Sequence, residues 1–256
     1  MSGISSINSY NSYQDYGKFA SGKRVQSAAD GAAELSIIEK QDAQSRGMKA
    51  GERNIGSAQD MLNIADGAMS GIADSLQRMR ELAVQASNTA TMTDDDRAAL
   101  QAEVDQLKQG IADIASQTNY NTKNLLDGAQ DEFNIAADSN GNGMTVNTGN
   151  ATLEALGIAD FDVTGDFDIK TIDDALSKVS STRSSMGAQS NALDYAYNYS
   201  TNTRMNTTAA QSRLEDLDYP KAISEQKKKE TLQEYMLFMQ QRKMQDDATQ
   251  MRMLFA

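Results

Sequence analysis

The sequence contains no cysteine, no histidine and no tryptophan, and it has one proline among 256 residues. Without cysteine no disulfide can form, and without cysteine or histidine no metal site based on those ligands can form. General-base catalysis by histidine and the serine–histidine and cysteine–histidine nucleophile pairs are excluded as well. Carboxylates could still serve as acid, base or metal ligand, so these absences disfavour an enzyme without forbidding one. We expect no catalytic function and no cofactor.

Aromatic residues are scarce, at 6%, and the formal net charge is −12. A nucleic-acid partner needs a basic surface, so none is expected. A composition with so few bulky apolar side chains suits an elongated helical protein with a narrow apolar stripe better than a globular core.

Long apolar runs are missing too. No segment is long and apolar enough to span a membrane, so no membrane partner is expected. The first 16 residues are rich in Ser, Asn and Tyr and lack the apolar region of a cleavable secretory signal peptide. Taken alone, this predicts a cytoplasmic protein or one exported by a route that uses no such signal.

The most regular pattern in the chain is an apolar stripe between residues 55 and 86. Its members follow one another at alternating spacings of three and four, which is the seam of a coiled coil sustained over more than four heptads. They are Ile55, Ala58, Leu62, Ala65, Met69, Ile72, Leu76, Met79, Ala83 and Ala86. The stripe predicts one long helix from about residue 32 to about residue 87.

Three further helices are expected. Thr93-Asp94-Asp95-Asp96 is a strong helix start, because threonine caps the helix and acids in its first turn oppose the helix dipole. This second helix should lie antiparallel to the first, since the connection between them is short. A third helix should run from Thr171 to about Leu217, and a fourth from about Pro220 to Phe255. The expected fold class is mainly α: an elongated antiparallel helical bundle or coiled coil with a small β-hairpin region.

The β region is expected within residues 131–170. Alternating apolar residues around Ser139-Asn140-Gly141-Asn142-Gly143 predict one hairpin, and the same pattern around Thr164-Gly165-Asp166 predicts a second. Asp138, Asn140, Asn142 and Gly143 match the first half of a calcium loop. Position 12 of that loop is Gly149 instead of glutamate, so we interpret the segment as a turn.

The last predicted helix carries a stripe rich in methionine. Its candidate assembly residues are Leu232, Met236, Met239, Met251 and Phe255. Such a stripe suits packing between molecules, and an internal core stripe is the alternative.

Three stretches together resemble bacterial flagellin. The first runs from Ala20 to Asp30 and on through Leu35 to Lys40. The second contains Gln77-Arg78-Met79-Arg80-Glu81-Leu82-Ala83-Val84-Gln85, followed by Leu100 to Val104 and Asn119 to Gly128. The third is Gln211 to Tyr219, similar to the family's Ser-Arg-Ile-Glu-Asp-Ala-Asp-Tyr. The two ends of the chain depart from the family pattern, and the short β region implies a form without the variable outer domains.

The resemblance implies a subunit of the extracellular flagellar filament, a homo-oligomer for cell motility, exported unfolded through the flagellar type III apparatus. An export chaperone and the cap protein would be partners. The implied division is residues 1–30 as inner-tube helix and connector, 31–130 and 171–217 as the two halves of the rod, 131–170 as the β-hairpin region, and 218–256 as the C-terminal inner-tube helix. The alternatives are the hook–filament junction protein and a non-assembling cytoplasmic adaptor.

A receptor role is implied for three residues. Arg78, Leu82 and Glu103 resemble the residues of the family that Toll-like receptor 5 engages. In the heptad assignment Leu82 lies one step off the seam and Arg78 points outward, so we expect both to be available to a partner. The alternative is that these residues bind the neighbouring subunit.

Overall fold

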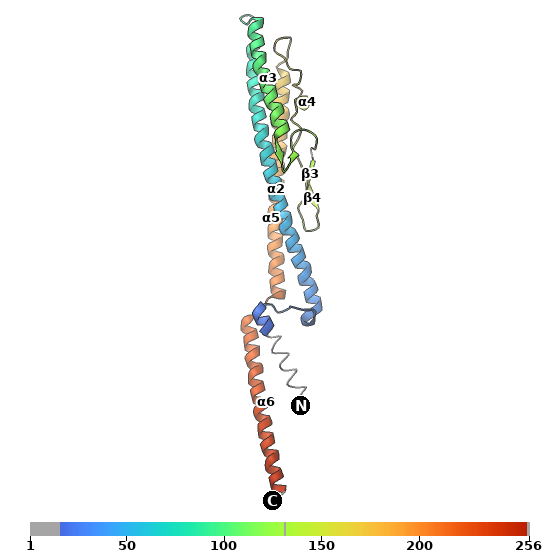
Figure 1. The fold of residues 1–256 in the computed structure, drawn as a ribbon, viewed down its shortest axis with the longest axis vertical. Helices are drawn as coiled ribbons and strands as arrows, with labels where there is room; N and C mark the ends of the chain where they lie inside the picture. The colour runs from blue at the N-terminus through green and yellow to red at the C-terminus, as the bar shows by residue number, and fades with distance from the viewer. Residues whose placement is uncertain (1–15, 131, 255–256) are drawn as a thin grey trace. The chain divides into compact units, whose positions relative to one another are not determined.

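The computed structural model describes residues 16–130 and 132–254 of the chain. In chain order the elements are α2 (Ala28–Ala86), α3 (Asp94–Gln117), β1 (Asn119–Tyr120), β2 (Lys123–Asn124), β3 (Glu132–Ala136), β4 (Gly143–Asn147), α4 (Leu153–Leu156), α5 (Lys170–Glu215) and α6 (Tyr219–Leu254) (Figure 1). Long helices with two small antiparallel strand pairs confirm the predicted mainly α class. Within the described residues, none of the helices combines the length and the apolar character needed to cross a membrane.

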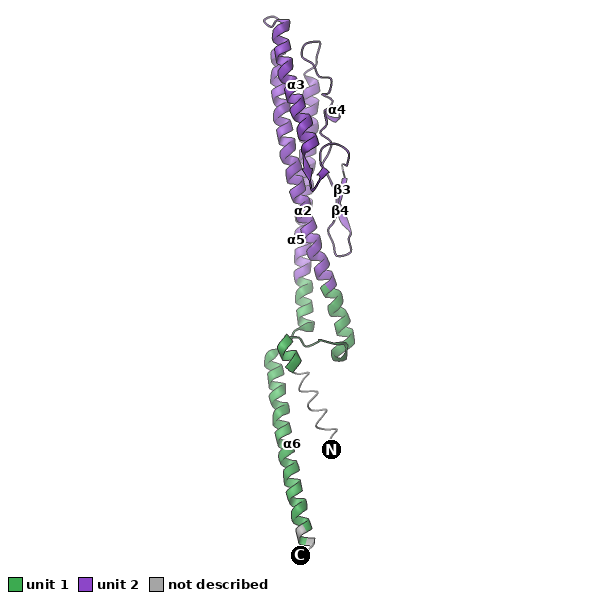
Figure 2. Cartoon of the chain, viewed as in Figure 1, with its two compact units in different colours: residues 1–42, 206–256 green, residues 43–205 purple. Residues whose placement is uncertain are grey.

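The chain divides into two compact units, which are described separately (Figure 2). Unit 2 comprises residues 43–205 and contains the core, α3, the strands, and most of α2 and α5. Unit 1 comprises residues 1–42 and 206–256 and contains the start of α2, the end of α5 and all of α6. The stripe predicted between Ile55 and Ala86 is confirmed, because all ten of its residues are buried in unit 2.

The predicted start of α3 is confirmed. Thr93 Oγ1 accepts a hydrogen bond from the Asp96 backbone N–H at 3.2 Å, and the Asp96 carboxylate accepts one from the Thr93 backbone N–H at 3.0 Å. This reciprocal pair satisfies donors that the first turn of a helix otherwise leaves unbonded. The hydrogen bond from the Thr93 backbone also lowers the pKa of Asp96, because it favours the charged carboxylate.

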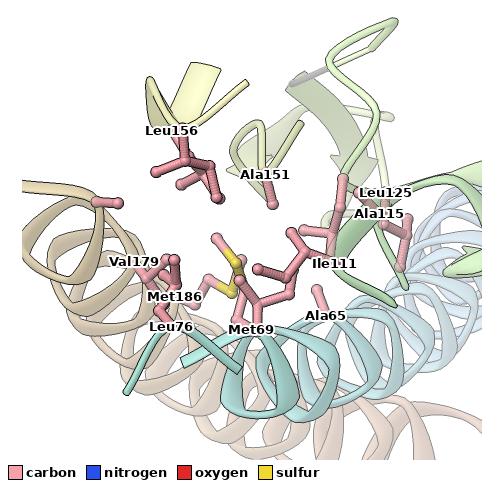
Figure 3. Close-up of a cluster of buried hydrophobic side chains, with 14 of the residues drawn as sticks. Ala65, Met69, Leu76, Ile111, Ala115, Leu125, Ala151, Leu156, Val179 and Met186 are labelled. Atoms are coloured by element: carbon pink, nitrogen blue, oxygen red, sulfur yellow. The ribbon is translucent and has the colours of Figure 1, made fainter. Parts of the chain in front are cut away.

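The core of unit 2 lies between α2, α3, α5 and the segment that follows α3. Side chains from all four meet in one cluster, in which Met69 and Leu76 of α2 lie near Ile111 of α3 and Met186 of α5 (Figure 3). Two helices therefore pack on α2, and α2 buries a wider face than a two-stranded seam would. The ion pair between Arg183 and Asp66, with Nε and Oδ1 2.8 Å apart, joins α5 to α2 beside this core.

The first predicted hairpin is confirmed and the second is wrong. Strands β3 and β4 pair antiparallel, with Phe133 opposite Val146. Residues 161–169 form no strand. Their backbone bonds to side chains instead: the Val163 N–H donates to Gln101 Oε1 of α3 at 2.8 Å, and the Thr164 N–H donates to Asp162 Oδ1 at 2.6 Å. Val163 is buried as the hairpin pattern suggested, but against the rod and not within a sheet.

Two further turns complete the β region. Asp138 Oδ1 accepts from the backbone N–H groups of Asn140 and Asn142, each at 2.8 Å, so the segment that partly matched a calcium loop forms the expected turn. The pair β1–β2, which precedes this region, was not predicted. Its turn residues, Asn121 and Thr122, both have positive φ, at 48° and 64°, as a tight two-residue hairpin requires.

In unit 1 the connector, residues 22–27, lies against the end of α5. The Arg24 backbone N–H donates to the Glu215 carbonyl at 2.6 Å, and the Leu217 N–H donates to the Gly22 carbonyl at 2.8 Å. The Arg24 guanidinium also donates to the Leu214 carbonyl at 2.7 Å. Residues nearly two hundred positions apart are thus joined through the backbone, and both belong to stretches that resemble flagellin.

The segment before the connector is helical from residue 16 to residue 21. The Tyr219 hydroxyl donates to the Phe19 carbonyl at 2.9 Å and lies 3.3 Å from where a Cβ on Gly22 would stand. Gly22 also has φ of 70°, a left-handed conformation that favours glycine. The helix predicted from about residue 32 begins at Ala28, but Gly31 breaks the helical conformation, so regular helix follows Gly31.

Asp30 organises the connector electrostatically. Its carboxylate lies 2.6 Å from Lys18 Nζ and accepts from the backbone N–H groups of Gln26 and Ser27 at 3.2 and 3.1 Å. The hydrogen-bonded Lys18 ammonium is the largest cause that lowers the pKa of Asp30 to about 2, and the backbone donors add to it.

We expect Asp30→Asn to destabilise unit 1 in a pH-dependent way. Because the pKa of Asp30 is lower in the folded protein than in the unfolded chain, its contribution is present above about pH 4 and is lost between about pH 4 and pH 2. We expect the substitution to lower the free energy of unfolding by at most about 1 kcal/mol, since solvent screens the ion pair between Asp30 and Lys18. Melting curves of the native chain and the variant should differ at pH 6 and converge by about pH 2. A difference that stays constant over this range would contradict the assignment.

Candidate assembly and partner-binding surfaces

Arg78 and Glu103 lie together on an exposed face formed by α2 and α3. Arg78 Nε donates to Glu103 Oε1 at 2.7 Å, and Arg78 Nη1 donates to Glu81 Oε2 at 3.0 Å. All three side chains are exposed to solvent. The hydrogen bonds that Arg78 donates to the Glu103 carboxylate and then to the Glu81 carboxylate raise the pKa of Arg78. The structure therefore brings two of the three predicted partner-binding residues together, with Glu81 as a third member that the prediction did not include.

Leu82 does not share this exposure. Its side chain has no exposed surface and belongs to the core cluster of unit 2. The expectation that Leu82 is available to a partner is wrong for the isolated chain. The heptad assignment placed it one step off a seam for one neighbour, whereas α2 packs against both α3 and α5, which buries positions on either side of the seam.

Helix α6 has the opposite character, because its apolar side chains are exposed. Every described side chain from residue 227 to residue 251 is exposed. The predicted assembly residues Leu232, Met236, Met239 and Met251 are all among them. Phe255 lies outside the described residues, as does the greater part of the polar segment 1–17.

Most of the exposed apolar residues of α6 between Leu232 and Met251 form two rows, and the exposed Phe238 lies on neither of them. The first row is Leu232, Tyr235, Met236 and Met239, at helical spacings of three and four. The second row is Leu237, Met244 and Met251, at spacings of seven. At 3.6 residues per turn the two rows lie roughly 130° apart around the helix. Leu237 was not among the predicted residues, and the seven-residue spacing was the signal that could have identified it. One helix thus presents apolar surface in two directions.

Comparison with known proteins relates this arrangement to a family. The model of the bacterial flagellin N-terminal helical region matches residues 4–131, and that of the bacterial flagellin C-terminal helical region matches residues 169–249. The chain is 37% identical over 215 residues to flagellin of Halalkalibacterium halodurans, covering 81% of this chain and 79% of that protein. The chain belongs to the bacterial flagellin family.

Other comparisons agree with this membership. Flagellar filament core protein flaB2 of Brachyspira hyodysenteriae is 34% identical over 220 residues, covering 78% of this chain and 76% of that protein. The crystal structure of Bacillus cereus flagellin is 31% identical, with a TM-score of 0.52, and the match covers 62% of this chain and 94% of that one. A hook-associated protein from Vibrio parahaemolyticus has a TM-score of 0.56 at 15% identity, covering 73% of this chain and 98% of that one, and this likeness shows the fold alone.

As a flagellin, the chain is a structural subunit of the bacterial flagellar filament, an assembly outside the cell. The filament prediction is confirmed, and neither the hook–filament junction nor the adaptor alternative is favoured. The two matched regions leave out residues 132–168, which hold β3, β4 and α4. This short segment is the internal part of the chain that lies between the two matched helical regions.

Proposed function

We propose that this flagellin assembles through α6, with its two apolar rows packed against terminal segments of its own chain and of neighbouring copies in the filament. The observation that carries the proposal is the exposure of the large apolar side chains of α6 along its length from Leu232 to Met251. Burying one such side chain fully contributes about 1.5–3 kcal/mol, so a row of three or four can drive association. A single partner would cover one row, and the presence of two rows supports contacts in two directions.

The test is polymerisation of the purified chain in which Leu232, Met236 and Met239 are replaced by serine. Electron microscopy should show filaments from the native chain and none from the variant, while circular dichroism shows the same melting of the rod. Normal filaments from the variant would contradict the proposal.

The remaining parts of the proposal follow from family membership and the surface of α6. An apolar surface of this kind requires cover before assembly, which supports an export chaperone as a partner, and the cap protein would act where subunits join the filament. Export would use the flagellar type III apparatus without a cleavable signal peptide. The chain would serve structure alone, without catalysis, and would follow the five-part division with residues 218–256 in the inner tube.

The exposed face of α2 and α3 is proposed as a second contact surface, for Toll-like receptor 5 or for a neighbouring subunit. Arg78 and Glu103 would touch the partner directly, and Leu82 would support them from the core. The matched control is Arg80, which forms a comparable exposed ion pair with Asp173 of α5 at 2.6 Å. Arg80 lies roughly 200° around α2 from Arg78, so it cannot share the same contact.

We expect Arg78→Ala and Glu103→Ala to weaken binding of the purified subunit to the receptor ectodomain, with little change in melting temperature. Exposed ion pairs contribute little to folding, so stability and binding should separate. Arg80→Ala should leave receptor binding unchanged. An equal loss from Arg80→Ala, or none from Arg78→Ala, would contradict a receptor surface at this face. Loss of polymerisation alone would assign the face to the neighbouring subunit.

A further inference from the structure

Methionine is distributed unequally between the core and α6. The core methionines Met61, Met69, Met79 and Met186 are at most 5% exposed. Helix α6 carries five of the 14 methionines of the chain, which are 47–73% exposed: Met236, Met239, Met244, Met251 and Met253. Leucine would supply similar apolar surface, so the use of methionine gives the helix a chemical property that leucine lacks.

That property is reactivity toward peroxides. The sulfur lone pair of an accessible methionine attacks one peroxide oxygen, the O–O bond breaks, and the sulfur gains an oxygen while the rest of the peroxide leaves as water. Sulfur is oxidised by two electrons and the peroxide is reduced. The product, methionine sulfoxide, is polar and chiral, and methionine sulfoxide reductases reverse it. The chain has no cysteine, so no thiol competes for the oxidant.

We propose that the methionines of α6 are a reversible oxidation site, at which hydrogen peroxide converts the unassembled subunit into a form that cannot polymerise. The inference rests on the proposed role of α6 in assembly. A sulfoxide oxygen on either apolar row would enter an interface built from Leu, Tyr and Met side chains, where a polar group is costly to bury without a hydrogen-bond donor. The methionines on both rows make both contact directions sensitive.

Because the core methionines are buried, oxidation should affect assembly and leave the fold unchanged. The core methionines have almost no exposed surface, so oxidant reaches them only when the rod opens. The rod would therefore stay folded while α6 loses its apolar rows. Assembled filaments would resist, because the proposed contacts cover the same sulfur atoms.

The experiment treats the purified full-length chain with hydrogen peroxide before or after polymerisation and maps sulfoxides by peptide mass spectrometry. In the unassembled chain we expect sulfoxide at the α6 methionines and at the exposed Met205 of α5, unmodified Met69 and Met79, an unchanged melting curve, and loss of polymerisation. Methionine sulfoxide reductase should restore polymerisation. Preformed filaments should keep their α6 methionines unmodified.

Two matched variants separate the effect of oxidising the α6 methionines from the effect of oxidising Met205. A chain with leucine at all five α6 methionines should polymerise after peroxide treatment, and Met205→Leu should remain sensitive. Sensitivity of the five-leucine chain, or normal polymerisation of chains oxidised at α6, would overturn the inference. The serine variant of the first row distinguishes the two proposals. If it polymerises normally, the assembly role of α6 fails; if it does not polymerise but chains oxidised at α6 do, only the oxidation site fails.

Discussion

Leu82→Ala is expected to lower the free energy of unfolding of unit 2 by about 2–5 kcal/mol, the range for removing a buried leucine side chain from a packed core. Leu82 has no exposed surface and lies in the cluster that also contains Leu76, Met79 and Ile111. The helices around it are long and held by many other contacts, so they cannot collapse into the space that the missing methyl groups leave. The decrease in the free energy of unfolding therefore has two parts: the lost transfer free energy of the removed methyl groups and the cost of the cavity that they leave.

Val84→Ala is the matched control for this experiment. Val84 lies on the same helix two residues away, but half of its side chain is exposed. Urea unfolding followed by circular dichroism should show a change within about 0.5 kcal/mol for this variant. Equal effects of the two substitutions would contradict the buried position of Leu82. If the expected difference is found, any loss of receptor binding in Leu82→Ala must be corrected for unfolding, whereas losses in Arg78→Ala need no such correction.

Serine at Leu232, Met236 and Met239 is expected to abolish polymerisation, which is the largest functional effect predicted for this chain. Full burial of each native side chain is worth about 1.5–3 kcal/mol, so one subunit loses roughly 5–9 kcal/mol of association free energy. A filament repeats the contact in every copy, and the critical concentration for assembly should rise by more than a thousandfold. Pelleting of polymer by centrifugation measures this concentration directly.

A control on the same helix separates lost contacts from lost helix. Glu234, Gln241 and Gln245 lie on α6 roughly 150° from the first row. Serine at these three positions lowers helix propensity by a similar amount but removes no apolar surface. This variant should polymerise close to the native concentration. Equal loss of polymerisation in both variants would show that helix stability, and not the first row, determines assembly.

Periodicity in the sequence predicted α2 and α3 correctly because each buries a stripe that repeats over several turns. The seam from Ile55 to Ala86 and the capping box at Thr93 are local signals, and both are present in the structure. The hairpin expected near Gly165 failed because alternating burial does not require a partner strand. Val163 is buried against the helices, and its N–H donates to a glutamine of α3.

The sites were predictable to different degrees. Leu82 was misplaced because a heptad describes one neighbour, and the second neighbour of α2 comes from a helix about a hundred residues later. Exposure of α6 could not be decided from its sequence, since an apolar stripe is the same pattern in a core and at an interface. The connector contacts to Leu214 and Glu215 carry no periodic signal, and only the resemblance to flagellin singled out both segments.

Assembly through both rows of α6 is tested most directly by electron cryomicroscopy of filaments grown from the purified chain. We predict that the chain polymerises without other proteins and that both rows, Leu232 to Met239 and Leu237 to Met251, are covered by other chain segments in the map. Filaments in which either row faces solvent, or a chain that stays monomeric under all polymerising conditions, would contradict it.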